Sequence, residues 1–316
     1  MYIDEFIFPD DILEQSFLNP APLSPGEMAA GVYRDFRATS YRGSLYPFRI
    51  LSSKGMSRVS FSDITIFCGS NGCGKTTALN VIAEKLHIKR DNMFNSGRFF
   101  QDYLNLCDYS SASDPDTSAR RFYGAPDAGI KIPAESRVIV SDDVFAHSMK
   151  QRAYNMQILK ERDDAENSYR EIVSGDPRLR SLDDYERYKE RQEALKSKSR
   201  FMKRHVEEEL PEHSNGESAM IYFIDRMEHP GLYLLDEPEN SLSLENQINL
   251  ADYISASSRI GGYQFIIASH SPIFLSMPGA RIYDMDEYPV RVKKWTEIES
   301  VRTLYNFFKT HERELE

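Results

Sequence analysis

Short apolar runs separated by longer mixed segments set the pattern of this chain. Four of them cover residues 64–68 (ITIFC), 137–141 (RVIVS), 231–235 (GLYLL) and 264–268 (QFIIA). Continuous apolar runs of about five residues are typical of strands that are buried on both faces of a sheet. Because helical patterns lie between these runs, the sequence predicts an α/β domain with a mostly parallel central sheet.

The residues before the first of these runs have a different character. Prolines interrupt residues 1–45, which also mix acidic and large apolar side chains. We therefore predict an irregular N-terminal extension that packs on the domain, with a partner-binding arm as the alternative. Regular structure, in the form of N-terminal β elements, is expected to begin near 48–51 and 58–61. Residues 107–132, rich in Ser, Asp, Gly and Pro, predict a long connection.

Residues 149–210 are densely charged and follow a helical pattern. The segment 174–177 (SGDP) divides this stretch, and Ser181 predicts an N-cap for the helix that follows. The apolar positions hold no heptad repeat, which argues against a long coiled coil. We predict one domain over 46–316, with 149–213 inserted as a helical lobe or a short hairpin with arms of about 25 residues, or roughly 40 Å.

Residues 69–76 (GSNGCGKT) match the phosphate-binding pattern G-x-x-x-x-G-K-[ST] at every fixed position. The strand pattern at 64–68 precedes this loop and a helical pattern at 78–86 follows it. Backbone N–H groups at such a helix start face an anion, and the helix dipole favours negative charge there. We predict that Lys75 contacts the β- and γ-phosphates of a nucleoside triphosphate and that the Thr76 hydroxyl binds Mg²⁺. The loop residues predicted to bind nucleotide are Asn71, Gly72, Cys73, Gly74, Lys75, Thr76 and Thr77.

Polar side chains follow two of the later apolar runs. Asp236 and Glu237 come directly after 231–235, and His270 comes shortly after 264–268. Ligands bind at the carboxyl ends of strands in parallel sheets. Asp236 is therefore predicted to hold Mg²⁺, Glu237 to polarise the water that attacks the γ-phosphate, and His270 to donate to the γ-phosphate oxygens.

A further motif, His-Ser-Asn-Gly-Glu-Ser at 213–218, opens the apolar helical segment 219–223. Ser214 and the backbone of Gly216 would lie at a helix N-terminus, which is again an anion site. By itself this pattern is also that of a routine N-cap, and it gains meaning from its place 22 residues before Asp236 (236 − 214).

The order of these motifs (phosphate loop, Ser-x-Gly-Glu, apolar-Asp-Glu-Pro, Ser-His-Ser-Pro) resembles the ATP-binding-cassette (ABC) ATPase superfamily over about residues 46–294. Within it the chain is most similar to the SMC/RecF/OLD-like branch and to small bacterial predicted AAA-family ATPases that consist of a head alone. The resemblance implies a P-loop NTPase fold of the ABC-head type, with ATP and Mg²⁺ as cofactors.

The same resemblance implies a composite active site. Ser214, Gly216 and Glu217 would contact the γ-phosphate of ATP held by a second subunit, with Asn240 and Ser241 in the loop that crosses between the heads. Two heads would then enclose two ATP molecules, so a homodimer or higher oligomer is expected.

The chain departs from the family pattern at several positions. His213 replaces the usual leading Leu of the signature, and Ser243 stands where relatives often have Asp or His. Neither change removes a metal ligand or the catalytic acid, so hydrolysis is expected to survive.

Two roles that the family fills are open in this sequence. Gln101 is the candidate for the glutamine between the phosphate loop and the helical lobe, and Asp142 or Asp143 is the alternative. Tyr46 and Phe48 are the candidates for stacking on adenine.

The composition of the chain bears on whether it binds nucleic acid, membranes or metal ions. The net charge of −10 gives no overall attraction to nucleic acid. No apolar run approaches the ~20 residues that span a bilayer, and the N-terminus shows no secretory signal. The three cysteines show no metal-ligand spacing. We expect a cytoplasmic protein with no membrane contact.

These observations favour an ATPase that couples a cycle of head dimerisation to a protein effector, which the resemblance places in bacterial anti-phage defence or genome maintenance. The alternative is a DNA-binding clamp of the SMC/RecF type, for which the basic stretch 196–204 (KSKSRFMKR) is the main feature. The ATP-binding subunit of a membrane transporter is a third hypothesis and the weakest.

Overall fold

The structure is a computed structural model of the chain and describes residues 1–19, 44–94, 96–111, 132–175, 182–206 and 215–315. The chain forms two compact units. One comprises Met1–Asp143 with Ala219–Glu316, and the other comprises Val144–Ser218. The predicted phosphate loop and the acids that follow the central strands all belong to the first unit.

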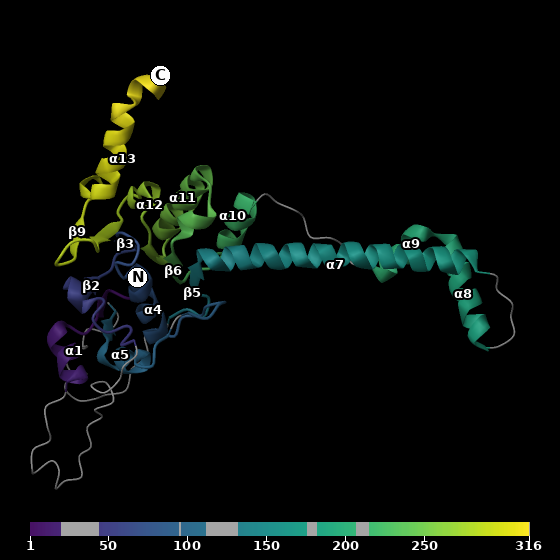
Figure 1. The fold of residues 1–316 in the computed structure, drawn as a ribbon, viewed down its shortest axis with the longest axis horizontal. Coiled ribbons are helices and arrows are strands. Elements are labelled where there is room, and N and C mark those ends of the chain that lie inside the picture. Colours follow the sequence, from purple (N-terminus) through teal and green to yellow (C-terminus); the bar gives the residue numbers. More distant parts are fainter. Residues whose placement is uncertain (20–43, 95, 112–131, 176–181, 207–214, 316) are drawn as a thin grey trace, which may run out of the picture. The chain divides into compact units, whose positions relative to one another are not determined.

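A six-stranded sheet forms the centre of the first unit, in the order β5-β6-β7-β3-β8-β9 (Figure 1). All neighbouring strands are parallel except β9, which pairs antiparallel with β8. The predicted α/β class with a mostly parallel central sheet is confirmed. The strands are β3 (Ile64–Cys68), β5 (Arg137–Val140), β6 (Leu232–Asp236), β7 (Gln264–Ala268), β8 (Arg281–Asp284) and β9 (Arg291–Lys293).

The register of the sheet brings the carboxyl ends of its parallel strands to one edge. Asp236 at the end of β6 pairs with Ala268 of β7, and Val140 of β5 pairs with Asp236. On the other side of β3, Cys68 pairs with Asp284 of β8. Loops that leave β3, β5, β6, β7 and β8 therefore begin side by side, which is the arrangement that places ligands at this edge.

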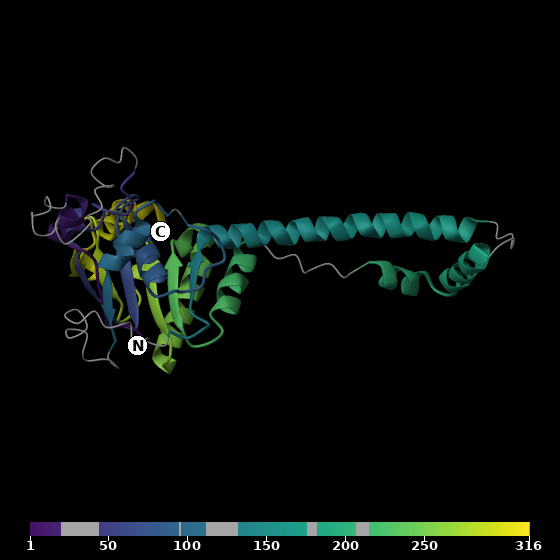
Figure 2. The same cartoon turned by 90° about the horizontal axis from the view of Figure 1, so that it is seen from below.

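Helices cover the sheet. α4 packs against β6 and β7, and α11 packs against β7 (Figure 2). Most of their buried side chains are apolar, among them Leu79 and Ile82 of α4 and Leu250 and Ile254 of α11. The helices of this unit are α4 (Lys75–Lys85), α5 (Phe100–Leu106), α10 (Asn215–Arg226, whose first turn belongs to the second unit), α11 (Leu244–Ile260), α12 (Pro272–Leu275), α13 (Glu299–Thr310) and α14 (Glu312–Leu315), with short 3-10 turns η1 (Ser52–Lys54), η2 (Pro238–Ser241) and η3 (Trp295–Glu297).

A second, antiparallel sheet has the order β2-β1-β4 and comprises β1 (Glu5–Ile7), β2 (Arg58–Ser60) and β4 (Asp108–Ser110). The expectation of irregular backbone from residue 1 is wrong here, because β1 and helix α1 (Asp11–Leu18) form before residue 19. Asp10 caps α1 by accepting from the backbone N–H of Leu13. Residues 20–43 of the predicted extension lie outside the described residues.

Buried polar contacts join these N-terminal residues to the rest of the unit. The side-chain oxygen of Gln264 accepts from the backbone N–H of Ile3 (3.1 Å), and its amide donates to the carbonyl of Ile3 (2.7 Å). The carboxylate of Glu14 accepts from the backbone N–H of Arg49 (2.7 Å) and from the hydroxyl of Ser52 (2.8 Å). The predicted strand at 48–51 does not form, since a turn occupies residues 46–50, Arg49 has φ 67° and η1 follows at Ser52.

Glu14 gives the chain a pH-dependent stability that can be measured. Burial raises the pKa of Glu14, and the hydrogen bond from Ser52 opposes that shift only in part. A carboxyl group whose pKa is raised by folding makes its full contribution to the stability of the folded state at pH values below its unfolded pKa of about 4.3. This contribution is lost as the pH rises through the pKa of the folded state.

Glu14→Gln keeps the acceptor for Arg49 and Ser52 and removes the buried charge. We expect the variant to unfold about 2–4 °C above the wild type at pH 7.5, the effect of roughly 1 kcal/mol in a chain of this size. The difference should vanish as pH falls to about 4. Thermal unfolding followed over this pH range tests the assignment, and a gain that does not change with pH would contradict it.

The second unit is helical. Helix α7 (Ser141–Ser174) begins in the first unit, eight residues before the predicted start at 149, and ends where the predicted break begins. α8 (Leu182–Lys196) and α9 (Lys198–His205) follow. The three helices are 34, 15 and 8 residues long, whereas the predicted hairpin had two arms of similar length. The predicted cap at Ser181 lies outside the described residues.

Within this unit α9 packs on α7. The Tyr169 and Phe201 rings lie 5.5 Å apart, and the Lys198 ammonium lies 2.6 Å from the Glu166 carboxylate. One cation of the basic stretch 196–204 is therefore paired with an acid of the same unit.

Among the described residues no helix is both long enough and apolar enough to cross a membrane.

Candidate nucleotide-binding site

The phosphate loop joins the buried strand β3 to helix α4, which begins at Lys75. Gly72 and Gly74 have φ of 83° and 107°, a region that other residues rarely adopt. A Cβ on Gly74 would lie 3.0 Å from the Ile50 side chain, so the loop also needs glycine here for space. The first turn of α4 thus directs its unpaired N–H groups at the loop, as an anion site requires.

Lys75 lies inside the loop and is 3% exposed. Its ammonium donates to the carbonyl of Gly69 (2.8 Å) and to that of Ser70 (3.1 Å), and lies 3.4 Å from Glu237 Oε1. Three oxygens therefore hold a buried cation at the centre of the loop, which is the charge that a polyphosphate needs.

The remaining loop residues differ in exposure. Asn71, Gly72 and Thr76 are exposed, whereas Cys73 and Thr77 are buried. Burial raises the pKa of the Cys73 thiol, so this side chain acts as a small apolar group in the loop. The exposed members are the ones whose polar atoms can meet a ligand.

The two predicted metal ligands lie together. The Thr76 hydroxyl donates to Asp236 Oδ1 at 3.1 Å. Burial raises the pKa of Asp236 to about 6, and the Thr76 hydrogen bond acts against that shift. A hydroxyl and a carboxylate are hard oxygen donors of the kind that bind Mg²⁺ together with phosphate oxygens and water, so these residues fit the ion. The described residues hold no cluster of three His, Cys, Asp or Glu side chains that would bind a metal without the nucleotide.

Glu237 follows Asp236 and turns the chain away from β6. Its φ of 46° and ψ of 52° place it in the left-handed region, an uncommon conformation for a residue with a side chain. Its backbone N–H donates to the Ala268 carbonyl at 2.9 Å, and its Oε2 accepts from the Asn240 amide at 2.9 Å. Both contacts fix the carboxylate beside Lys75 while leaving a quarter of the side chain exposed.

His270 follows β7, next to the Glu237 end of β6. Glu239 Oε1 accepts from the backbone N–H of His270 (2.7 Å) and from the Ser269 hydroxyl (2.9 Å), and lies 3.1 Å from His270 Nδ1. Glu239 is 7% exposed, whereas the His270 side chain is half exposed. A partner on Nδ1 orients the ring and leaves Nε2 for another contact.

Sequence reasoning missed Glu239 as a site residue. It treated residues 239–243 only as the crossing loop, because an acid in a turn between two helices or strands ordinarily lies in solvent. The short turn η2 instead folds Glu239 back under β7, and the only sequence signal is its place two residues after Glu237 in the run Asp-Glu-Pro-Glu.

Comparison with known proteins decides the family. Residues 108–276, more than half of the chain, match the family described as "AAA domain, putative AbiEii toxin, Type IV TA system". The chain belongs to this family. The matched range contains Asp236, Glu237 and His270, and the phosphate loop of this AAA domain precedes it. No curated protein matches the chain.

Several solved structures are similar to this AAA domain. The SMC head domain from Thermotoga maritima is 16% identical, with 75% of this chain and 92% of that chain covered and a TM-score of 0.35. An SMC head domain with an extended coiled coil, bound to the C-terminal domain of ScpA and derived from Pyrococcus furiosus, is 12% identical, with 81% and 95% covered and a TM-score of 0.34. A nucleotide-free ATP-binding cassette from an ABC transporter is 13% identical, with 79% and 87% covered and a TM-score of 0.34.

The family match confirms the predicted resemblance to AAA-family ATPases.

The candidates for the family's glutamine between the phosphate loop and the helical lobe lie in different places in the structure of this AAA domain. Gln101 is exposed on α5, and its amide donates to Asn105 on the same helix at 3.4 Å. Asp142 and Asp143 instead follow β5, whose Val140 pairs with Asp236. Asp143 is buried and accepts from the backbone N–H of Val140 at 3.0 Å, whereas Asp142 is exposed. The register places the acids, and not Gln101, at the site edge of the sheet.

Of the two candidates for adenine stacking, Phe48 is wrong. It is 3% exposed, stacks on Phe17 with ring centroids 5.2 Å apart, and meets Tyr103 edge-on at 5.0 Å. Its ring is part of the core and presents no face to a ligand. Tyr46 is partly buried and stacks on Phe100 at 6.0 Å.

Of the predicted signature, only Gly216 and Glu217 lie among the described residues. Ser214 and His213 lie outside those residues. Gly216 and Glu217 occupy the first turn of α10, within the helical unit, whereas the loop belongs to the other unit.

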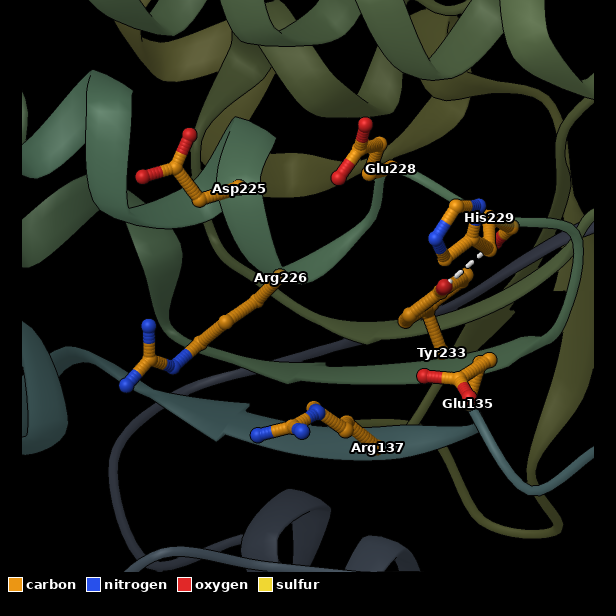
Figure 3. A pocket seen from close by; sticks show the side chains of 7 residues that line it. All are labelled: Glu135, Arg137, Asp225, Arg226, Glu228, His229 and Tyr233. Atoms are coloured by element: carbon orange, nitrogen blue, oxygen red, sulfur yellow. Dashed lines mark hydrogen bonds between the residues drawn. The ribbon is translucent and has the colours of Figure 1, made fainter.

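A polar cavity of about 280 Å³ lies near the amino-terminal ends of β5 and β6, at the opposite ends of these strands from the loop (Figure 3). Asp91 accepts from Arg226 at 2.9 Å and lies 3.4 Å from the guanidinium of Arg137. Both cations near the cavity are thus already paired, and none of the predicted site residues lines it. Its lining residues are Glu135, Arg137, Asp225, Arg226, Glu228, His229 and Tyr233.

Proposed function

We propose that this AAA domain binds Mg-ATP at the carboxyl edge of its central sheet and hydrolyses it to ADP and phosphate. The observation that carries the proposal is the convergence of Lys75, Thr76, Asp236 and Glu237, whose polar atoms lie within 3.1–3.4 Å of one another in pairs. A cation, two metal-binding oxygens and a second carboxylate are the parts that phosphoryl transfer to water requires.

Each residue has a defined task in this proposal. The Lys75 ammonium leaves the Gly69 and Ser70 carbonyls and binds the β- and γ-phosphate oxygens. Mg²⁺, held by Thr76 and Asp236, neutralises charge on those oxygens when bound. Glu237 orients the attacking water and accepts its proton.

His270 is the fifth functional side chain. Glu239 accepts from Nδ1 of the ring, and the Nε2–H of the doubly protonated imidazolium donates to the γ-phosphate. Hydrolysis removes the group that His270 contacts, and the contact is lost with it.

A second copy of the chain completes the site in this proposal. Ser214, Gly216 and Glu217 of one head contact the γ-phosphate held by the other, with Asn240 and Ser241 between them. The exposure of His270 and Glu237 supports this arrangement, because groups that act on a γ-phosphate are ordinarily shielded from water during hydrolysis.

The family description names a toxin of a toxin–antitoxin system, and this supports a role in bacterial anti-phage defence, with the ATP cycle coupled to a protein effector. The DNA-clamp alternative has less support, since Lys198 of its basic stretch is already paired with Glu166. We therefore propose that the ATP cycle acts on a protein partner.

The composite site is tested by light-scattering mass and phosphate release with and without Mg-ATP. We expect the wild type to hydrolyse ATP and its mass to double with Mg-ATP. Ser214→Arg should abolish the doubling and lower hydrolysis at least tenfold while ATP still binds, because the arginine blocks the second head. Thr303→Arg, an exposed site on α13, is the matched control and should behave as wild type. Doubling of Ser214→Arg would contradict the composite site, and absence of ATP binding by the wild type would contradict the proposal as a whole.

A further inference from the structure

Ser70, the second residue of the phosphate loop, is held by an acid from outside the loop. Its backbone N–H donates to Asp286 Oδ2 at 2.8 Å, and its hydroxyl donates to Asp286 Oδ1 at 2.7 Å. On its other side the Ser70 carbonyl accepts from Lys75 at 3.1 Å. All the polar groups of Ser70 are therefore occupied, and one carboxylate takes two of them.

The sheet itself places Asp286 at the loop. Cys68 pairs with Asp284, and the ladder ends with the backbone N–H of Met285 donating to the Cys68 carbonyl at 2.8 Å. The next residue, Asp286, must then lie beside the start of the loop. Its own N–H donates to Asp284 Oδ1 at 3.1 Å, which fixes the turn that carries it.

Gly69 makes the close approach of this carboxylate possible. A Cβ at position 69 would lie 3.2 Å from Asp286 Oδ1 and 2.7 Å from the Cys73 sulfur. The glycine of the motif thus serves a contact with the turn after β8 in addition to the loop's own conformation.

We propose that Asp286 is a positioning residue that holds the first turn of the phosphate loop in its nucleotide-binding shape. The proposal rests on the proposed ATP binding and adds a residue that the phosphate-binding motif does not contain. Two hydrogen bonds to a carboxylate are stronger than two to water, so the loop is ordered before the ligand arrives.

The negative charge of Asp286, taken alone, predicts that this residue weakens ATP binding, which is the opposite of the proposed role. An acid beside a polyphosphate site repels the ligand, so its removal should tighten ATP binding. If Asp286 instead orders the loop, its removal weakens binding, because the ligand must then fix the loop itself. The sign of the change in affinity therefore decides between the two roles.

The test is the Kd for Mg-ATP, by titration calorimetry, of the wild type, Asp286→Ala, Ser70→Ala and the double variant. We expect Asp286→Ala to bind about tenfold more weakly, and the double variant to be no weaker than Asp286→Ala, since both changes break the same contact. Glu287→Gln is the matched control: it removes one negative charge from the next residue, whose carboxylate pairs with Lys293 at 2.7 Å. Tighter binding by Asp286→Ala, or losses that add in the double variant, would overturn the proposal.

A second readout needs no ATP. Amide hydrogen exchange at Ser70 in the ligand-free protein should accelerate about tenfold in Asp286→Ala and stay unchanged in Glu287→Gln. Unchanged exchange in Asp286→Ala overturns the positioning role even where ATP binding is intact. If the wild type binds no ATP, the proposed function fails, and accelerated exchange in Asp286→Ala would still uphold the contact that orders the loop.

Discussion

Glu237→Gln is expected to lower the rate of ATP hydrolysis by about 10²–10⁴-fold while changing the Kd for Mg-ATP by less than about threefold. The glutamine keeps the shape of the side chain and can still accept from Asn240, but it cannot take a proton from water. The left-handed backbone of Glu237 is retained as well, because its N–H remains bound to the Ala268 carbonyl.

Single-turnover phosphate release and titration calorimetry measure these two effects separately. Glu245→Gln, an exposed acid in the first turn of α11, is the control and should hydrolyse ATP at the wild-type rate. In the composite site, the variant should also hold Mg-ATP long enough for the doubled mass to persist. A Glu237→Gln protein that retains more than about a tenth of the wild-type rate would show that another group activates the water.

Lys75→Ala is expected to raise the Kd for Mg-ATP at least 100-fold. The ammonium is buried at the centre of the loop, where a hydrogen bond to a charged phosphate contributes about 1.5–3 kcal/mol and several such bonds form together. The substitution also removes the bonds to the Gly69 and Ser70 carbonyls, so the loop loses an internal support.

Thermal unfolding with and without Mg-ATP reports the binding change. A ligand present at 100 times its Kd stabilises the fold by about 2.7 kcal/mol, so the wild type should melt several degrees higher with Mg-ATP and Lys75→Ala should not. Lys85→Ala, in the last turn of the same helix, controls for loss of a lysine from α4. A ligand-induced shift in Lys75→Ala equal to that of the wild type would place the nucleotide elsewhere.

The central strands β3, β6 and β7 could be predicted from sequence because they are buried at every position and read as continuous apolar runs, whereas β8 and the exposed β9 were not predicted. The phosphate loop, Asp236, Glu237 and His270 could be predicted as one site for the same reason, since each directly follows such a strand. The order and register of the strands were not predicted, because they depend on pairing between segments that are distant in sequence.

The N-terminal elements could not be predicted in the same way. β1 is three residues long, and its pairing partners β2 and β4 lie about 50 and 100 residues further along the chain. The short strand has no periodicity of its own, and its stability comes from non-local pairing.

Glu239 and Asp286 escaped prediction for a related reason. Each lies in a tight turn and contacts a residue that follows a different strand: Glu239 contacts His270 after β7, and Asp286 contacts Ser70 after β3. Sequence spacing gives the position of a turn but not the direction in which its side chains point.

Helix α7 begins at Ser141, the residue after β5, and runs without interruption for 34 residues. At about 1.5 Å per residue it is roughly 50 Å long. Its first turn follows Val140, which pairs with Asp236 in the sheet. A continuous helix behaves as a stiff lever, so a tilt of about 10° in its first turn displaces its far end by roughly 9 Å. Because the helix is continuous, the angle at which it leaves β5 sets the position of its own last turn.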